Sequence, residues 1–433
     1  MQFLINNPQF WRSNGLNEEV PENMELKLKD GKLELPAEIK EKLGLNSETE
    51  VKIKFNQNGI YIERADPQLT KVYIEPTSDC NLDCKTCVRH SWEEEMGFMQ
   101  LEDYKKLVGD LKKFKGLEKI SFWGIGEPLY HPELAEMIEL ASELEVKTQI
   151  ITNGLLLDQK KAESLLEAGL DSLVVSVDGT SPETMADIRS GADLKTVIKN
   201  VQNFRNLRDK NQKNCEIGIE YVIMKSNVDE LKDLRKLAFK MGASFIFLTN
   251  LLPYTEDMSD EILYSFSISR SQPKIRTEHR PEIYLPPTDL REDIIRDLAA
   301  VGGKSSSIST TQVPFNPHRG YCKFVEEGSI AVNWQGEISP CIALMHSYDL
   351  YIRERKKHIN KYSLGKISEK SLAEIWNSSE FKNFRKKVKD FPFSDCTQCS
   401  GCEMSKKNEE DCHGNEFPVC GDCLWARGVI QCP

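Results

Sequence analysis

The chain has 433 residues, of which 39% are hydrophobic, and a formal net charge of −11. This length suits two or three domains with proper cores, and an acidic charge without blocks of like charge argues against nucleic acid as the main partner. No apolar run approaches a membrane span and the first residues lack the regions of a signal peptide, so we expect a cytoplasmic protein with no membrane partner.

Residues 1–66 are the first predicted region. Residues 1–23 show no clear periodicity, whereas residues 24–63 predict a small β-rich unit. Its elements are a strand ending at Leu33-Glu-Leu-Pro36, a short helix closed at Gly44, and two strands, Val51 to Phe55 and Ile60 to Glu63, that turn at Asn58-Gly59. Because so small a core is not stable alone, we expect it to pair with a second chain or to dock on a larger domain.

This unit resembles the swapped-hairpin domain of AbrB/MazE-like proteins. The resemblance rests on Leu35-Pro36 and on Leu43-Gly44-Leu45 before the strand pair. It implies a domain that forms a homodimer and, in that family, often binds DNA. Positive and negative charges nearly balance across the unit, which favours dimerisation or the docking of a client over DNA binding. An N-terminal decoration that only covers a sheet edge is an alternative.

From residue 67 to residue 252, apolar strands alternate with amphipathic helices. Strands are predicted near 72–75, 118–123, 147–152, 172–178, 216–224 and 244–250. Helices are predicted near 101–114, 132–144, 158–168, 193–209 and 227–241. This alternation predicts an α/β fold with a parallel sheet, whose chemistry is expected where the carboxyl ends of the strands meet.

Three thiols follow the first of these strands in Cys80-Asn-Leu-Asp-Cys84-Lys-Thr-Cys87. Three closely spaced thiolates can hold a 4Fe-4S cluster and leave one iron open for chemistry. A zinc knuckle, or a disulfide pair with a spare thiol, would explain the same spacing. The spacing resembles the cluster motif of the radical S-adenosylmethionine (SAM) superfamily, in which the open iron binds the amino and carboxylate groups of SAM. Thr86 departs from the aromatic residue usual at its position in that family.

The second strand is followed by Trp123-Gly-Ile-Gly126-Glu127-Pro128. Glycine lets the backbone approach a ligand closely, and a carboxylate accepts a hydrogen bond from an ammonium group. The segment resembles the Gly-Gly-Glu-Pro motif of the radical SAM superfamily. The resemblance implies that Gly126 and Glu127 bind the amino group of SAM. Taken by itself, the segment is equally well an ordinary turn.

Polar residues also follow the third and fourth strands. Asn153-Gly154 ends the third strand, and Ser176 and Asp178 lie on one face of the fourth. Arg189, further along, carries the planar fork of donors that suits a carboxylate. By resemblance to radical SAM enzymes, we expect Asn153, Ser176, Asp178 and Arg189 to contact SAM. As isolated residues they would equally well be caps or surface ion pairs.

The order of these motifs after four successive strands favours the radical SAM interpretation over a zinc site. The resemblance implies a partial (β/α)6 barrel. It also implies reductive cleavage of SAM to methionine and a 5′-deoxyadenosyl radical, with electrons from a donor such as ferredoxin or flavodoxin. A closed barrel would keep such a radical from side reactions.

Residues 253–318 are interpreted as a connector with a helix at 290–300, and residues 319–433 as a cysteine-rich domain. Clustered cysteines in a reducing compartment favour metal binding. The spacing Cys322-x13-Gly336-x4-Cys341, about a predicted strand pair at 329–339, resembles the start of the SPASM domain, which holds auxiliary iron–sulfur clusters. The further cysteines are Cys396, Cys399, Cys402, Cys412, Cys420, Cys423 and Cys432.

The resemblance implies two auxiliary 4Fe-4S clusters. In one, Cys322 and Cys341 would be joined by Cys423 and Cys412. In the other, the ligands would be Cys396, Cys399 or Cys402, Cys420 and Cys432. Two clusters need eight ligands and the domain has nine cysteines, so at least one is spare. One or two zinc ribbons are the alternative.

The AbrB-like start and the cysteine-rich ending together resemble the tungsten cofactor oxidoreductase radical SAM maturase family. This implies a client, either a tungsten-containing aldehyde oxidoreductase or its tungstopterin cofactor. The first alternative is a peptide-modifying SPASM enzyme that forms thioether or carbon–carbon crosslinks, although residues 24–63 do not resemble the winged helix usual in that group. The second is a non-catalytic iron–sulfur redox sensor that binds DNA.

Overall fold

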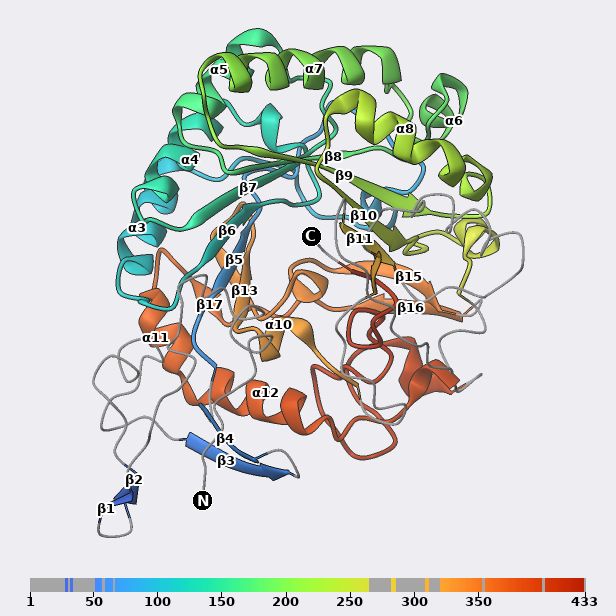
Figure 1. Ribbon diagram of the computed structural model, residues 1–433. Helices are drawn as coiled ribbons and strands as arrows, with labels where there is room; N and C mark the ends of the chain where they lie inside the picture. The colour runs from blue at the N-terminus through green and yellow to red at the C-terminus, as the bar shows by residue number, and fades with distance from the viewer. Residues whose placement is uncertain are drawn as a thin grey trace.

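The computed structural model of the chain describes residues 28–29, 32–33, 51–56, 59–64, 67–264, 282–285, 308–310, 320–352, 355–398 and 402–431. Within these ranges, one sheet of eleven strands organises the fold. Helices cover its outer face, and the C-terminal part of the chain, orange to red, lies across its open side (Figure 1). The predicted α/β class is confirmed.

Six parallel strands form the centre of this sheet and follow one another in chain order. They are β5 (Lys71–Ile74), β6 (Lys119–Phe122), β7 (Lys147–Thr152), β8 (Ser172–Ser176), β9 (Glu216–Ile223) and β10 (Phe245–Asn250). All six were predicted, because each is a short segment with apolar residues between turn signals.

The helices between these strands are α3 (Leu101–Leu111), α4 (Leu134–Ser142), α5 (Gln159–Glu167), α6 (Pro182–Ile188), α7 (Leu194–Lys210) and α8 (Leu231–Met241). Helix α8 shows why they form. Its buried residues recur at helical spacing, at Leu231, Leu234, Ala238 and Met241. Gly242 ends it in the left-handed region, at φ 74°. None of the helices in the described ranges is long and apolar enough to span a membrane.

Successive residues of the central strands alternate between the helix layer and the concave face of the sheet. On β8, Leu173 and Val175 belong to the core under the helices. On the concave face, Ser121 Oγ donates to Gln149 Oε1 at 3.1 Å, and Gln149 Nε2 donates to Ser172 Oγ at 3.5 Å. A polar layer therefore crosses three strands inside the curve of the sheet.

Both edges of the sheet extend beyond the six predicted strands. The residues interpreted as a connector supply β11 (Glu282–Leu285) and β12 (Ile308–Thr310), which continue the parallel pairing next to β10. The sequence did not predict these strands, because each has only three or four residues and lies in a segment without clear periodicity. The predicted helix at 290–300 lies outside the described residues.

On the other edge, the C-terminal region joins the sheet directly. The predicted strand pair is confirmed as β13 (Ser329–Val332) and β14 (Glu337–Ser339), which pair antiparallel. Strand β13 runs parallel to β5 and pairs with it along its whole length. Strand β17 (Gly365–Lys366) pairs with β14. The C-terminal region is thus continuous with the central sheet.

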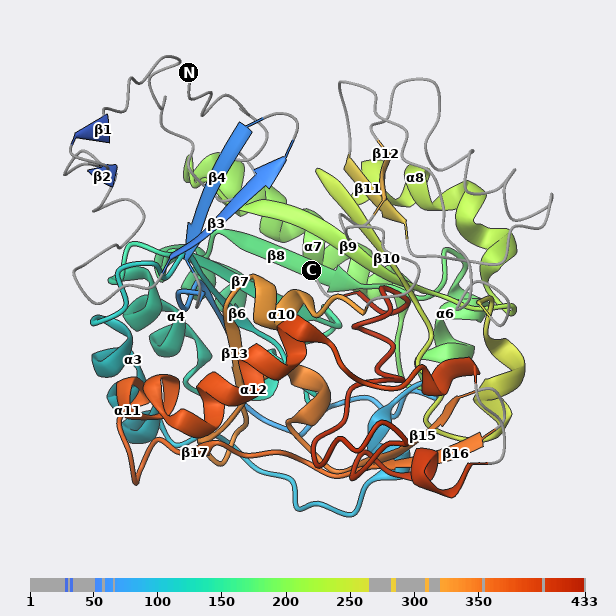
Figure 2. The ribbon, with the colours of Figure 1, turned by 90° about the horizontal axis from the view of Figure 1, so that it is seen from below.

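Three C-terminal helices lie on the side of this edge, α10 (Lys323–Glu326), α11 (Leu372–Asn377) and α12 (Ser379–Asp390). The hairpin β15 (Tyr348–Ile352) and β16 (Arg355–Ile359) lies away from this edge and contacts the 3-10 helix η1 (Val88–Ser91) (Figure 2). Other short 3-10 helices are η2 (Pro128–Tyr130), η3 (Val228–Glu230), η4 (Asp257–Glu261), η6 (Ile342–Leu344), η7 (Cys396–Gln398) and η8 (Glu403–Lys406).

Before the central sheet, two antiparallel strand pairs are described. They are β1 (Leu28–Lys29) with β2 (Lys32–Leu33), and β3 (Val51–Asn56) with β4 (Gly59–Arg64). The strand pair predicted about the Asn58-Gly59 turn is confirmed as β3 and β4. The predicted helix closed at Gly44 lies outside the described residues, and the likeness to AbrB-like domains stays a prediction.

Candidate active site

The three predicted cluster ligands lie on the loop that leaves β5. Hydrogen-bond donors point at two of their sulfurs: Leu82 N lies 3.4 Å from Cys80 Sγ, and Arg89 Nε lies 3.2 Å from Cys87 Sγ. Arg89 also donates to the carbonyl of Leu82, which ties the loop into a closed turn. Donors of this kind stabilise thiolate sulfur, the form in which cysteine binds metal.

The charge balance of the loop also suits a metal-bound form. Burial raises the pKa of the Cys80 thiol and raises that of Cys84 to about 11. The three thiols oppose one another's ionisation, while Arg89 and Arg189 favour it. A bound metal cluster would supply the positive charge that holds all three as thiolates.

Across the described ranges, no three His, Cys, Asp or Glu side chains lie close enough together to share a single metal ion. In a 4Fe-4S cluster each of the three thiolates would bind a different iron.

Gly126 and Glu127 follow β6 and lie against the cluster loop. A Cβ atom at Gly126 would come within 2.3 Å of the Thr77 carbonyl oxygen and 2.4 Å of that of Asp79. Only glycine allows this approach. The Glu127 amide then donates to Asp79 O at 2.8 Å. The loop predicted to hold the cluster and the loop predicted to bind SAM are therefore in direct contact.

The Glu127 carboxylate is buried and accepts three hydrogen bonds from the protein. Leu129 N and Thr152 Oγ1 donate to Oε1, at 3.0 and 2.6 Å, and Asn153 N donates to Oε2 at 2.7 Å. Burial nevertheless raises its pKa more than these bonds lower it. Glu127 thus links the end of β6 to the end of β7 through hydrogen bonds. Its Oε2 atom accepts only one of them, so it can accept another from a ligand.

Asn153 reaches from the end of β7 to the cluster loop. Its Nδ2 lies 2.9 Å from Asn81 Oδ1 and 3.9 Å from Cys80 Sγ, and its Oδ1 accepts from Leu155 N at 3.0 Å. The Nδ2 atom of Asn153 therefore bonds to the cluster loop, and its Oδ1 atom bonds to the turn that follows β7. The residue was predicted to contact SAM, and its position beside the first thiol agrees with that expectation.

Ser176 lies at the end of β8 and faces a carboxylate that the sequence analysis missed. Its Oγ donates to Glu220 Oε2 at 3.2 Å, and the two residues are register partners on β8 and β9. Burial raises the pKa of Glu220 to about 7. The signal was present, since Glu220 is a charged residue in the middle of a strand that is mostly apolar, but strand periodicity alone gives no role for it.

Asp178, whose predicted contact with SAM stays a prediction, bonds to other residues of the chain. It is fully buried, and both carboxylate oxygens have protein partners: Arg189 Nε donates to Oδ2 at 2.7 Å and Val222 N donates to Oδ1 at 3.0 Å. Asp178 therefore positions Arg189 and β9, because it has left the strand alternation that would have put it beside Ser176.

Arg189 ends α6 and lies among Asp178, Cys84 and Glu220, which together hold its pKa above the ordinary value. Among the described residues, Nε alone of its guanidinium nitrogens makes a hydrogen bond, to Asp178. The two terminal nitrogens keep their donors for a ligand beside the cluster loop. A carboxylate such as that of SAM suits them by charge and geometry.

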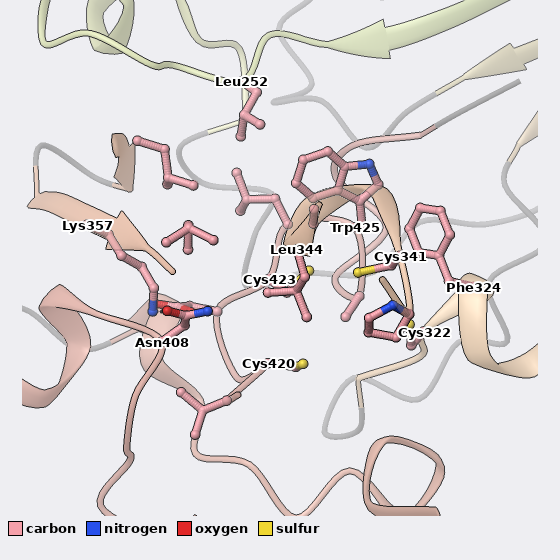
Figure 3. Close-up of a pocket in the computed structure, with 18 of the residues that line it drawn as sticks. Leu252, Cys322, Phe324, Cys341, Leu344, Lys357, Asn408, Cys420, Cys423 and Trp425 are labelled. Atoms are coloured by element: carbon pink, nitrogen blue, oxygen red, sulfur yellow. The ribbon is translucent and has the colours of Figure 1, made fainter. Parts of the chain in front are cut away.

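A second group of cysteines lines a cavity in the C-terminal region (Figure 3). Cys322 precedes α10, Cys341 precedes η6, and Cys420 and Cys423 lie in the C-terminal loop. The four side chains come from three separate segments and surround one space, and burial raises the pKa of every one of them.

The surroundings of these four thiols fit a cluster. Backbone N–H groups of the following turn point at three of the sulfurs, those of Cys322, Cys341 and Cys423. The cavity is otherwise mostly apolar, with Lys357 hydrogen-bonded to Asp422 at 2.8 Å on its wall. Four thiols with N–H donors in an apolar pocket are a ligand set typical of a 4Fe-4S site.

This arrangement changes the predicted ligand assignment. Cys420 joins Cys322, Cys341 and Cys423, although the prediction placed Cys412 there and Cys420 in the other set. Cys412 is exposed to solvent instead. The C-terminal loop bends so that Cys420 and Cys423 both face the cavity, which spacing alone does not reveal. Of the other predicted set, Cys396 and Cys402 are described, and Cys399 and Cys432 lie outside the described residues.

We expect Cys420→Ser to lower the iron content of anaerobically reconstituted protein from about twelve to about eight atoms per chain, because one of three 4Fe-4S clusters is lost. Cys412→Ser is the matched control and should retain about twelve, since Cys412 would be the spare ninth cysteine. Iron and acid-labile sulfide analysis measures both. Equal losses in the two variants would contradict the assignment.

Comparison with known proteins identifies two domains in the chain. A family model described as the radical SAM superfamily matches residues 74–238, and one described as the SPASM iron–sulfur cluster-binding domain matches residues 322–403. Over 369 residues the chain is 32% identical to a Pyrococcus furiosus protein named tungsten-containing aldehyde ferredoxin oxidoreductase cofactor-modifying protein. That match covers 84% of this chain and 96% of the relative.

Two further relatives are similar over less of the chain or at lower identity. A PqqA peptide cyclase of Granulibacter bethesdensis is 28% identical over 42% of this chain and 46% of its own. Streptococcus suis SuiB bound to S-adenosylmethionine has a TM-score of 0.53 and 18% identity, over 78% of this chain and 71% of that one, which shows a shared fold. The chain therefore belongs to the radical SAM family with a C-terminal SPASM domain that includes the Pyrococcus protein, and is an enzyme that uses SAM and iron–sulfur clusters.

Proposed function

We propose that this enzyme matures a tungsten-containing oxidoreductase, acting on its tungstopterin cofactor or on the client protein that holds the cofactor. The observation that carries the proposal is the 32% identity to the Pyrococcus cofactor-modifying protein, which extends through both the radical SAM core and the C-terminal region. Similarity confined to the core would support radical SAM chemistry alone.

The residues described above suit this role. Cys80, Cys84 and Cys87 would hold the cluster, and the terminal nitrogens of Arg189 would bind the carboxylate of SAM. The Gly126 backbone and the free acceptor position of Glu127 would receive its amino group. Ser176 and Glu220 would face its ribose. Bound there, the cluster and SAM supply one-electron cleavage of a carbon–sulfur bond, which gives a carbon radical able to abstract hydrogen from a substrate.

Other residues of this chain prepare the site for that chemistry. Arg189 and Arg89 offset the negative charge of the thiolates, and Glu127 and Asn153 hold the loops in a fixed geometry before any ligand binds. Apolar residues of η1 and β15, among them Val88 and Tyr348, pack together directly after the cluster loop. Electrons would come from a small donor protein such as a ferredoxin or flavodoxin.

Peptide modification is the competing function. The similarity to PqqA peptide cyclase covers 42% of this chain, and SuiB is related at the level of fold. Neither extends through the whole chain at the identity of the tungsten cofactor-modifying relative. We therefore favour the tungsten client.

Anaerobic turnover tests the proposal. Reconstituted enzyme, dithionite and SAM are mixed with a tungsten-containing aldehyde oxidoreductase isolated before maturation, or with its released pterin cofactor. We expect 5′-deoxyadenosine well above the level without client and a mass change in the cofactor or the client. Cys84→Ala is the control for background cleavage. A response to a cysteine-rich peptide and none to the tungsten client would contradict the proposal.

A further inference from the structure

His346 joins the C-terminal region to the loops around the SAM site. It follows η6 and is almost fully buried, with 1% of its side chain exposed. Its Nε2 lies 2.9 Å from Glu75 Oε2, and its Nδ1 lies 2.7 Å from Glu94 Oε2. The ring of Trp92 packs edge-on against the imidazole, with centroids 4.7 Å apart. An imidazolium between two carboxylates can donate a hydrogen bond to each.

Glu75 connects His346 to the loop predicted to bind the SAM amino group. It is the first residue after β5 and is fully buried. Its Oε1 accepts from Ile125 N at 3.0 Å, directly before Gly126, and its Oε2 also accepts from Trp334 N at 3.3 Å. A Cβ atom at Gly124 would come within 2.5 Å of Glu75 Cγ, so only glycine lets the carboxylate lie against this loop.

Glu94 connects His346 to the segment that follows the three cluster cysteines. Its Oε1 accepts from Ser347 N at 2.8 Å while Oε2 faces the imidazole. The same segment packs Gly97 against Trp334, where a Cβ atom would meet the indole ring at 2.5 Å. Both loops of the SAM site therefore contact the C-terminal region, through His346 and through Trp334.

The charges that face His346 come from three elements. They are Glu75 at the end of β5, Glu94 in the segment after η1, and Lys361 after β16. The charge of Lys361 lowers the pKa of Glu94, and its Nζ lies 3.1 Å from Glu337 Oε2. The two carboxylates outweigh the cost of burial and raise the pKa of His346 from 6.5 to about 9. At neutral pH the histidine is therefore a cation, and its loss would leave Glu75 buried without a counter-charge.

We propose that His346 is a positioning residue for SAM, through which the C-terminal region holds the Gly124–Glu127 loop and the segment after the cluster cysteines in their binding geometry. The inference rests on the assignment of the SAM amino group to this loop, and is independent of the identity of the client. It assigns to the SPASM domain a part in SAM binding besides the holding of auxiliary clusters.

The test compares His346→Gln with His358→Gln in full-length, anaerobically reconstituted protein. His358 is the matched control, because it also pairs with a carboxylate, Asp349 Oδ1 at 2.8 Å from its Nδ1, but its side chain is 43% exposed and its partner is neither Glu75 nor Glu94. SAM affinity is measured without client and without reductant, by equilibrium dialysis of SAM against the oxidised, iron-loaded protein, which can bind SAM but lacks the electron needed to cleave it. We expect His346→Gln to weaken SAM on the order of tenfold with iron content unchanged, and His358→Gln to match wild type.

The pH profile separates positioning from a merely structural role. In wild type and His358→Gln, SAM affinity should fall as pH rises through about 9, where His346 loses its proton. His346→Gln should lack this step. Ionisation of the SAM amino group itself is common to all variants and cancels in the comparison.

Two results would overturn the inference. One is wild-type SAM affinity in His346→Gln at pH 7.5. The other comes from Glu94→Gln, which serves if His346→Gln fails to fold: removing one carboxylate should move the step toward neutral pH, and an unmoved step contradicts the proposal. Failure of wild type itself to bind SAM would instead refute the SAM site, and is distinguishable from both.

Discussion

Replacing Cys84 by alanine removes SAM cleavage: we expect production of 5′-deoxyadenosine to fall to the background of dithionite and SAM alone. The three thiols of the β5 loop are the complete protein ligand set of a cluster with one open iron, so no neighbouring cysteine is free to take the place of one of them. The charge of Arg189, the residue assigned to the SAM carboxylate, also favours the thiolate of Cys84, so the loss of this cysteine should disturb the SAM site as well as the cluster.

Cys215→Ala is the matched control for this experiment. Cys215 is a buried thiol at the start of β9, and burial raises its pKa to about 12, as expected of an inert cysteine. We expect this variant to retain SAM cleavage with a stability loss of about 1 kcal/mol. Wild-type levels of 5′-deoxyadenosine from Cys84→Ala, measured by chromatography against this control, would refute the assignment of the trio.

The second large effect is expected at Glu127. In Glu127→Ala the amides of Leu129 and Asn153 lose their acceptor inside the protein, at a cost of about 1 to 3 kcal/mol each. The hydrogen-bonded link between the ends of β6 and β7 is lost with these bonds. We expect a lower unfolding temperature and a fall in SAM cleavage on the order of 10²-fold, because small displacements of positioned groups slow chemistry strongly.

Asp158→Ala distinguishes loss of stability from loss of the site. Asp158 caps α5 on the outer layer, where its Oδ1 accepts from Lys161 N at 2.8 Å. Its removal should cost about 1 kcal/mol of stability and leave SAM cleavage unchanged. Thermal unfolding and 5′-deoxyadenosine formation are measured on both variants at a temperature where each is folded. Equal cleavage by the two variants would show that Glu127 is only structural.

The sequence predicted the central sheet because its signals are local. Each strand from β5 to β10 is a short segment with apolar residues, and each of the main motifs follows such a segment within a few residues. The cluster trio and Gly126-Glu127 could be assigned for the same reason, since a parallel sheet brings the ends of its strands to one edge. The α6 helix was missed because it has only seven residues.

Contacts between distant parts of the chain could not be predicted in the same way. Glu75 and His346 are 271 residues apart, and nothing near either one indicates the other. The exchange of Cys420 for Cys412 has a similar cause, since it depends on how a long loop folds back to the hairpin. The partners of Asp178 were not predicted, because Arg189 and Val222 lie on other elements.

The C-terminal region has a closer relation to the core than its separate motifs suggested. Strand β13 extends the central sheet next to β5, and β5 is the strand that leads into the cluster loop. One continuous sheet therefore supports the cavity of four cysteines, the His346 ion pairs and the SAM loops. Substitutions in the SPASM region should be tested for effects on SAM as well as on the auxiliary clusters.

The most direct test of the account is the fate of SAM in anaerobically reconstituted wild-type protein under dithionite, followed by liquid chromatography and mass spectrometry. The account predicts 5′-deoxyadenosine and methionine in equal amounts, at a level that depends on the protein. Intact SAM after prolonged incubation with fully reduced, iron-loaded protein would contradict it.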